Sequence, residues 1–202
     1  AFLIKYLETF EGAPAGDLAD AQPHAVQAAI GYITAPAVSQ SSNLIDLDAV
    51  RSLASDAKYG KLHELLRIFA TERLEAYLAF HAANPGFGDS IGLDHDQSVR
   101  TMRLLSLCSL AADGECVAYA TIQETLQVPA ESVEGWVVDA ISLGLINGRL
   151  DQIKEEVVVS RWTQRVFGDA EWLRLQSRLG SWRDNVGHLL ASIKAARASS
   201  SV

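Results

Sequence analysis

Residues 116–159 read CVAYATIQETLQVPAESVEGWVVDAISLGLINGRLDQIKEEVVV, and they constrain the architecture more than any other part of the chain. Residues 116–118 fit a very short strand. Apolar side chains spaced three and four positions apart then make a helical face over 119–126, and Pro129 breaks that helix. A second helical face follows over 131–143. This part of the chain is therefore predicted to begin as a strand and two short helices joined by a turn.

Two runs with the period of a β-strand complete this part of the chain. Ile146, Gly148 and Leu150 share one face of the first run. Val157 and Val159 share one face of the second. The polar residues between the runs form a turn. Two helices followed by a β-ribbon are the winged-helix arrangement, a variant of the helix-turn-helix. We therefore predict a winged helix over residues 103–167.

Upstream of the winged helix the apolar pattern is helical. The segments in which apolar side chains recur three and four positions apart are Phe2–Phe10, Ala25–Ile33, Leu47–Leu53, Leu62–Phe69, Leu74–His81 and Asp94–Ala112. A change of phase near Ala70 allows two antiparallel helices there or one kinked helix. Loops are predicted over 39–43 and 84–92. Because the connections are short, we predict a mostly α chain that starts with a small helical solenoid over residues 1–102.

The last of these segments, 94–112, is apolar almost all round near its C-terminal end. A helix of that kind is buried on every side. We predict that it lies at the centre of the chain and joins the solenoid to the winged helix.

The C-terminal segment carries the most regular pattern in the chain. We predict one long helix over residues 168–198, followed by a polar frayed tail over 199–202. Its apolar residues alternate in steps of three and four, the heptad spacing of a helix that packs along one seam. This seam consists of Trp172, Leu175, Leu179, Trp182, Val186, Leu189 and Ile193, and Ala196 extends it.

A seam with two Trp residues predicts an interface, because Trp is a frequent anchor of protein contacts. We favour bundling with helices of other chains, and the alternative is docking on the chain's own solenoid. The β-ribbon predicts a second interface, since an open strand edge pairs with other strands. We place that edge at Val157, Val158, Val159 and Arg161.

The charge distribution argues against nucleic-acid binding. The 202 residues carry a net charge of −8, which divides into −6 over residues 1–114, −5 over 115–161 and +3 over 162–202. Affinity for phosphates comes from clustered Lys and Arg, whereas the predicted second helix of the winged helix, 131–143, contains three carboxylates and no basic residue. We predict no direct contact with DNA, and a winged-helix DNA-binding regulator is the alternative of another class.

Five Arg residues near the C-terminus have two possible roles, a solvated helix face or contact with ribosomal RNA. They are Arg165, Arg174, Arg178, Arg183 and Arg197. The solvated face is favoured, because aromatic residues do not alternate with the Arg residues on that side.

The sequence contains no strong signature of an active site. The five His residues are scattered, without an HExxH motif or a Cys/His cluster, and no nucleophile elbow occurs. Asp94 beside His95 and Asp96 fits a helix N-cap better than a metal site. We predict no enzyme, no metal and no cofactor.

The cysteines and the apolar runs bear on location. Only two cysteines are present, and Cys108 is predicted to be a small core residue. This low count favours a reducing, cytoplasmic environment, and no apolar run reaches the roughly 18 residues of a membrane span. The chain starts without Met, as expected for a piece of a longer protein.

Several motifs together resemble a known family. The chain is similar to the PCI module, a helical repeat capped by a winged helix, which the proteasome lid, the COP signalosome and eukaryotic translation initiation factor 3 share. The general motifs are Met102–Leu107 and the wing Gly148–Gln152. The motifs that resemble the subunit M family of initiation factor 3 are Asp56–Tyr59, Gly92–His95, Val157–Gly168, Trp172 and the helix that contains Trp182. The wing alone does not separate this family from signalosome subunit seven.

The resemblance implies a non-catalytic scaffold. In such complexes winged helices line up side by side in an arc, and C-terminal helices gather in a bundle. The neighbours that the resemblance implies within initiation factor 3 are its A subunit, beside the winged helix, and its F subunit, which is of the MPN type. The assembly binds the small ribosomal subunit and supports recruitment of messenger RNA and initiator tRNA. The equivalent PCI subunit of the signalosome or the proteasome lid is the alternative within the same class.

Overall fold

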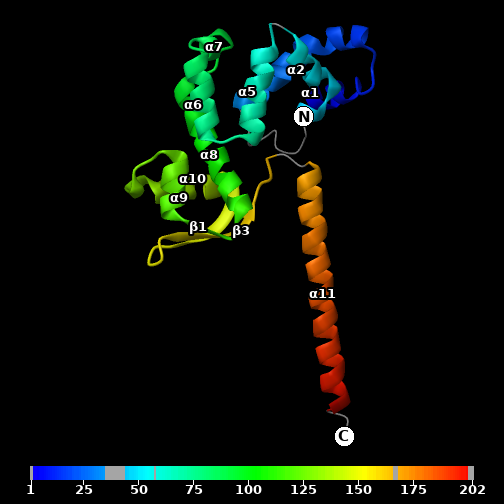
Figure 1. Ribbon diagram of the computed structural model, residues 1–202, viewed down its shortest axis with the longest axis vertical. Helices are drawn as coiled ribbons and strands as arrows, with labels where there is room; N and C mark the ends of the chain where they lie inside the picture. Colours follow the sequence, from blue (N-terminus) through cyan, green and yellow to red (C-terminus); the bar gives the residue numbers. More distant parts are fainter. Residues whose placement is uncertain (1, 35–43, 57, 166–167, 200–202) are drawn as a thin grey trace. The chain divides into compact units, whose positions relative to one another are not determined.

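The computed structural model describes residues 2–34, 44–56, 58–165 and 168–199 (Figure 1). It divides into two compact units, residues 1–166 and residues 167–202. The fold class is mostly helical with one small antiparallel sheet, as predicted. No described helix combines the length and the apolar character that crossing a membrane requires.

The first unit begins with two helices, α1 (Phe2–Glu8) and α2 (Ala15–Thr34). Helix α2 starts earlier than predicted and continues through Pro23. Its small apolar side chains Ala21, Ala25 and Ala29 are fully buried. Burial of this face overrides the low helix propensity of proline. The predicted loop over 39–43 lies outside the described residues.

A run of short turns confirms the helical segment predicted near residues 47–53. It consists of η1 (Leu44–Asp46), α4 (Asp48–Arg51) and η2 (Ser52–Ser55). Leu44, Val50 and Leu53 contribute to the core of the helical repeat.

The phase change near Ala70 corresponds to two helices rather than one kinked helix. They are α5 (Gly60–Thr71) and α6 (Leu74–Ala83). Glu72 and Arg73 between them are extended, and the backbone N–H of Leu74 donates to Ser106 Oγ at 2.9 Å. The predicted loop 84–92 contains a short helix, α7 (Phe87–Ser90).

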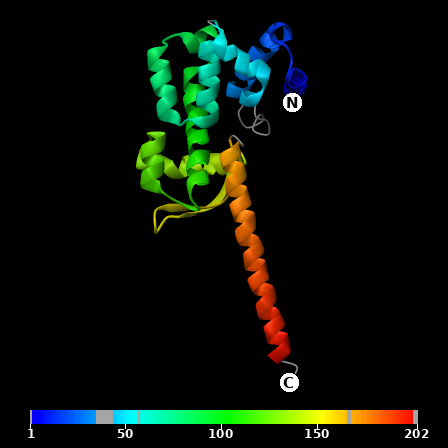
Figure 2. The ribbon, with the colours of Figure 1, turned by 45° about the vertical axis from the view of Figure 1, so that its right-hand side comes forward.

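Helix α8 (His95–Asp113) joins the two halves of the first unit, as predicted (Figure 2). The Asp94 carboxylate accepts from the backbone N–H of Asp96 at 2.9 Å, which confirms the predicted N-cap. Met102 and Leu105 belong to the core of the helical repeat. Leu107 and Leu110 belong to the core of the winged helix. One helix therefore contributes to both cores.

The winged helix follows in the predicted order. Its elements are β1 (Cys116–Ala118), α9 (Tyr119–Leu126), η3 (Ala130–Ser132), α10 (Val133–Ser142), β2 (Ile146–Asp151) and β3 (Glu156–Trp162). Gly144 has a φ of +71° and donates its backbone N–H to Ile141 O at 2.9 Å. It ends α10 in the left-handed conformation that glycine favours.

The sheet has the strand order β1-β3-β2, and both pairings are antiparallel. Cys116 pairs with Val158 and Val117 with Val157. On the other side of β3, the pairing with β2 runs from Glu156 to Trp162, with an irregularity at Asn147/Gly148. Strand β3 is therefore central, although the sequence predicted it as one strand of a two-stranded ribbon.

The second unit contains one helix, α11 (Asp169–Ser199), which confirms the long helix predicted over 168–198. It is drawn in orange and red in Figure 1. Most of the tail predicted over 199–202 lies outside the described residues.

Candidate interaction surfaces

The seam of α11 is exposed along its whole described length. Its seven residues are between 38% and 72% exposed, Leu175 least and Trp182 most. The side chain of Ala196, which would extend the seam, lies outside the described side chains. Burying one large apolar side chain contributes roughly 1.5–3 kcal/mol. Covering the described seam with another apolar surface therefore lowers the free energy of the protein in water.

The flanks of the seam are apolar at two further points and basic at several others. Leu173 and Leu190 lie off the heptad positions and are also exposed. Arg174, Arg178, Arg183 and Lys194 give this helix a basic character. Arg183 contacts Asp184 at 3.3 Å, and both side chains are largely exposed. Exposed pairs of this kind contribute little stability.

The predicted strand edge at Val157–Val159 is wrong, because β3 is not an edge strand there. Val157 and Val158 pair with β1, and the backbone N–H of Val159 donates to Glu115 O at 2.7 Å. Val157 and Val159 also point into the winged-helix core. Arg161 lies beyond the pairing with β1 and is exposed. The outer strands of the described sheet are β1 and β2.

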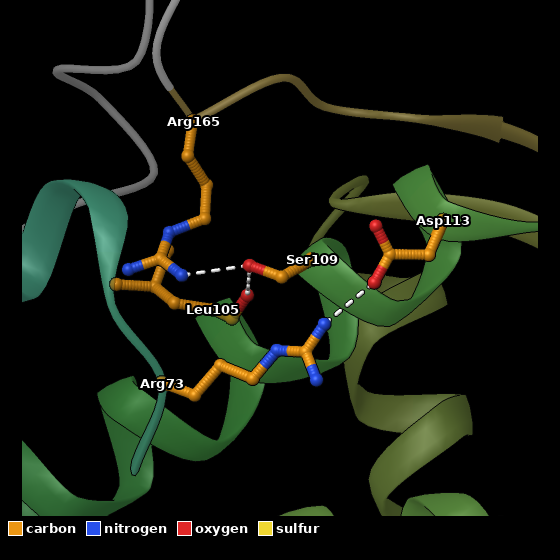
Figure 3. A network of polar contacts seen from close by, with 5 residues as sticks. All are labelled: Arg73, Leu105, Ser109, Asp113 and Arg165. Atoms are coloured by element: carbon orange, nitrogen blue, oxygen red, sulfur yellow. Dashed lines mark hydrogen bonds and ion pairs between the residues drawn. The ribbon is translucent and has the colours of Figure 1, made fainter. Parts of the chain in front are cut away.

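Arg165 was predicted on a solvated helix face, and this prediction is also wrong. Arg165 follows β3 and is only 9% exposed. Figure 3 shows its side chain reaching helix α8, where Nη1 donates to Ser109 Oγ at 2.7 Å. Nη2 donates to Phe69 O at 2.7 Å and lies 3.4 Å from Ile68 O. The guanidinium therefore caps the C-terminal end of α5, where the helix dipole favours a cation.

Arg165 lies where three segments meet, namely the chain after β3, the end of α5 and helix α8. The Ser109 hydroxyl also donates to Leu105 O at 3.2 Å. Arg73 forms an ion pair with Asp113 nearby (Figure 3). Burial lowers the pKa of Arg165 to about 10, and the nearby Tyr32 and Cys108 partly offset this effect. Nε is buried without a hydrogen-bond partner among the described atoms. The residue links the exit of the winged helix to the helical repeat.

Helix α10 would enter the major groove in a DNA-binding winged helix. Asp139 on this helix forms an ion pair with Arg100 at 2.7 Å. The Trp136 ring has Arg100 at 5.8 Å and Arg103 at 5.4 Å from its centroid. Two Arg residues of α8 therefore contact α10. The charge of residues 131–143 alone did not indicate these contacts. Both Arg residues contact α10 side chains within the fold.

One small cavity brings histidines together. Tyr77, His81 and His95 line it, together with residues of α7. The two imidazole rings stack with centroids 4.0 Å apart, and Tyr77 Oη shares a hydrogen bond of 3.1 Å with His95 Nδ1. Among the described residues, no three His, Cys, Asp or Glu side chains are grouped to hold a metal ion.

The two cysteines lie in different environments, as predicted for Cys108. Cys108 is buried and Cys116 is exposed. Burial raises the pKa of the Cys108 thiol to about 11, and the charge of Arg165 opposes this shift. Cys108 is therefore a core residue rather than a reactive thiol.

Two family descriptions match this chain. Residues 83–161 match "PCI domain", and residues 165–193 match "eIF3 subunit M, C-terminal helix". The first match covers α8 and the winged helix, and the second covers Arg165 and the seam of α11. The two matches therefore include the elements described above.

Curated relatives match over most of the chain. "Eukaryotic translation initiation factor 3 subunit M" of Dictyostelium discoideum is 39% identical over 198 residues, which are 97% of this chain and 49% of the relative. The protein of the same name from Aspergillus oryzae is 40% identical over 200 residues, 96% of this chain and 42% of the relative. The chain thus spans about half the length of the curated relatives it matches.

Proposed function

The chain belongs to the subunit M family of eukaryotic translation initiation factor 3, a PCI-domain family, and from this premise we propose that it is a non-catalytic scaffold subunit of that factor. It acts in the cytoplasm as part of a complex that binds the small ribosomal subunit. Its expected neighbours are the A subunit of the factor, beside the winged helix, and the F subunit.

The exposed seam of α11 is the observation that supports this proposal most directly. Seven large apolar side chains at heptad spacing are exposed on one helix, and two of them are Trp. Covering this seam with helices of neighbouring subunits removes apolar surface from water. A seam with heptad spacing also fixes the register of a helical partner. Helix α11 therefore binds as one helix of an intermolecular bundle.

The winged helix contributes a second contact in this proposal. The outer strands β1 and β2 are available for side-by-side packing, and β1 contains only three residues. Strand β2 is the longer outer strand. Together with Arg161, which lies beyond the end of β1, it is the part of the sheet that a neighbouring protein reaches. Val157–Val159 support that surface from within.

The test compares two double variants of the full-length protein. Trp182→Asp with Leu189→Asp places two charges in the seam. Ser181→Asp with His188→Asp places the same charges on the adjacent positions, which lie on another side of the helix. All four side chains are exposed, so both variants keep the fold of the first unit. The readout is co-purification with the tagged A and F subunits.

We expect the seam variant to lose the other subunits and the control variant to retain them. Burying an uncompensated charge in an apolar interface costs several kcal/mol, which is enough to release the chain from its complex. Equal recovery of the A and F subunits with both variants would contradict the proposed role of the seam.

A further inference from the structure

The first unit exposes apolar side chains on a surface that the scaffold role of α11 does not use. Ile153 at the tip of the wing is 97% exposed, and Val138 on α10 is 50% exposed. Val138 lies one helical turn after Glu134, so both belong to the same stripe of α10. Glu134 contacts the wing at Gln152. We call Glu134, Val138, Gln152 and Ile153 the helix–wing surface.

The wing tip is held by hydrogen bonds to α10 and α9 and by one bond within the turn. Gln152 Nε2 lies 3.0 Å from both carboxylate oxygens of Glu134, and Tyr119 Oη donates to the same carboxylate at 3.2 Å. The backbone N–H of Tyr119 donates to Glu155 O at 2.8 Å. The backbone N–H of Lys154 donates to Asp151 Oδ1 at 3.1 Å. A fixed loop loses little entropy when a partner binds it.

The helix–wing surface lies in an acidic environment. Glu131 precedes it, and Asp151, Glu155 and Glu156 flank the wing tip. Lys154 is directed to Glu156, with Nζ 3.8 Å from the carboxylate. The pKa of Tyr119 is raised, first by desolvation and then by Glu134, Asp151 and Glu155. Carboxylates of both the wing and α10 therefore make the electrostatic potential negative at Tyr119.

We propose that the helix–wing surface binds a basic peptide segment of another protein, whose apolar side chains cover Val138 and Ile153. Lys or Arg residues of that segment lie against the carboxylates around the wing tip. Winged helices that read DNA use their second helix and wing against phosphates. Here carboxylates stand on the corresponding elements, so the surface repels nucleic acid and attracts cations. The site is independent of the α11 seam, and either can fail without the other.

The test uses the full chain and three defined probes. They are a short amphipathic peptide made only of Leu and Lys, its counterpart made of Leu and Glu, and a single-stranded oligouridine. Binding is followed by backbone amide chemical shifts, which locate the probe on the chain. The variant Val138→Ser with Ile153→Ser removes the apolar contacts. Leu143→Ser is the matched control, because Leu143 is 54% exposed at the end of the same helix, on another side of it.

We expect the Leu/Lys peptide to shift amides of residues 134–138 and 151–155. The double variant should bind it about tenfold more weakly, the scale of losing an interface anchor, and Leu143→Ser should bind it as the unaltered chain does. Replacing Glu131 and Glu155 by Gln should weaken binding further, most clearly at low salt. The Leu/Glu peptide should not bind. Equal loss in the Leu143 control, shifts confined to α11, or binding of oligouridine at the wing would overturn the proposal.

Discussion

Arg165 is a charged side chain that the fold removes almost entirely from water. Its partners are two backbone carbonyls at the end of α5 and the hydroxyl of Ser109, and none of these hydrogen-bond partners is a carboxylate. A buried cation without a bonded counter-ion is tolerated when oriented dipoles replace its hydration. The contribution of Arg165 to the stability of the fold therefore depends on how its guanidinium is placed against these acceptors. A cation of another shape cannot replace it fully.

We predict that Arg165→Met destabilises the first unit by about 2–4 kcal/mol. The substitution keeps an apolar stem but leaves buried acceptors unsatisfied, which costs about 1–3 kcal/mol for each group. Arg165→Lys should recover only part of the loss, because Lys cannot contact both sites as a planar fork. The measurement is urea unfolding followed by near-UV circular dichroism. Arg149→Ala, at an exposed position, is the control and should change stability by less than about 0.5 kcal/mol. A similar effect of both substitutions would refute this role.

The two thiols should differ in reactivity in the folded chain. Near pH 8, a thiol reagent should modify Cys116 quickly and Cys108 only after unfolding, because the thiolate is the reactive form and Cys108 is buried. Peptide mass mapping of native and urea-treated samples measures this. Rapid native labelling of Cys108 would mean that α8 opens readily.

Cys108 also predicts a pH dependence of stability. Burial raises the pKa of its thiol from 9.0 to about 11. The unfolded chain therefore releases this proton first as pH rises. The contribution of the Cys108 thiol to the free energy of unfolding is fully present below pH 9 and is lost between about pH 9 and 11. Cys108→Ala should reduce the decline of the urea midpoint over this range. An identical decline in the variant would assign it to other groups.

At the scale of an element, two glycines of the winged helix should respond to Ala in opposite ways. A Cβ on Gly148 would lie 2.6 Å from Val158 O, in the backbone of the neighbouring strand. A Cβ on Gly135 in α10 would meet no atom within 4 Å. We predict that Gly148→Ala destabilises the winged helix. Gly135→Ala should stabilise it by up to about 1 kcal/mol, because Gly is a poor helix former.

Thermal unfolding of both glycine variants measures this contrast. Each adds one methyl group to the same subdomain, so each is the control for the other. A lower midpoint for Gly135→Ala would contradict the open space around Gly135. An unchanged midpoint for Gly148→Ala would indicate that β2 and β3 separate easily at the irregularity.

At the scale of the whole molecule, the first unit should fold without α11. Among the described side chains, every buried member of both apolar cores lies before residue 160, and Trp162 packs against the second core. Arg165 completes the contacts of that unit. We predict that a chain ending after Gly168 keeps the urea midpoint of the full chain. Fluorescence of Trp136 and Trp162, which remain, follows its unfolding. A lower midpoint would show that α11 packs against the first unit, which would contradict the intermolecular role of the seam.

Much of the helical and winged-helix pattern was predictable from local signals. The three-and-four spacing of Tyr119, Ile122 and Leu126 marks α9. Pro129 breaks that helix, and Gly144 marks the end of α10. Strand β1 was also predictable as a strand. Its partner was not, because pairing Cys116 with Val158 joins positions far apart in sequence. This long-range pairing is the reason that the predicted edge at Val157–Val159 was wrong.

The sequence by itself determined the order of the elements, the double role of α8 and the heptad seam of α11, because these follow from the periodicity of apolar residues along the chain. Tertiary structure alone decided which strand is central, that Arg165 is buried at the end of α5, and that Glu134 meets Gln152 at the wing. Periodicity is a local property, whereas strand order and the partners of a charged side chain depend on which distant segments share a core.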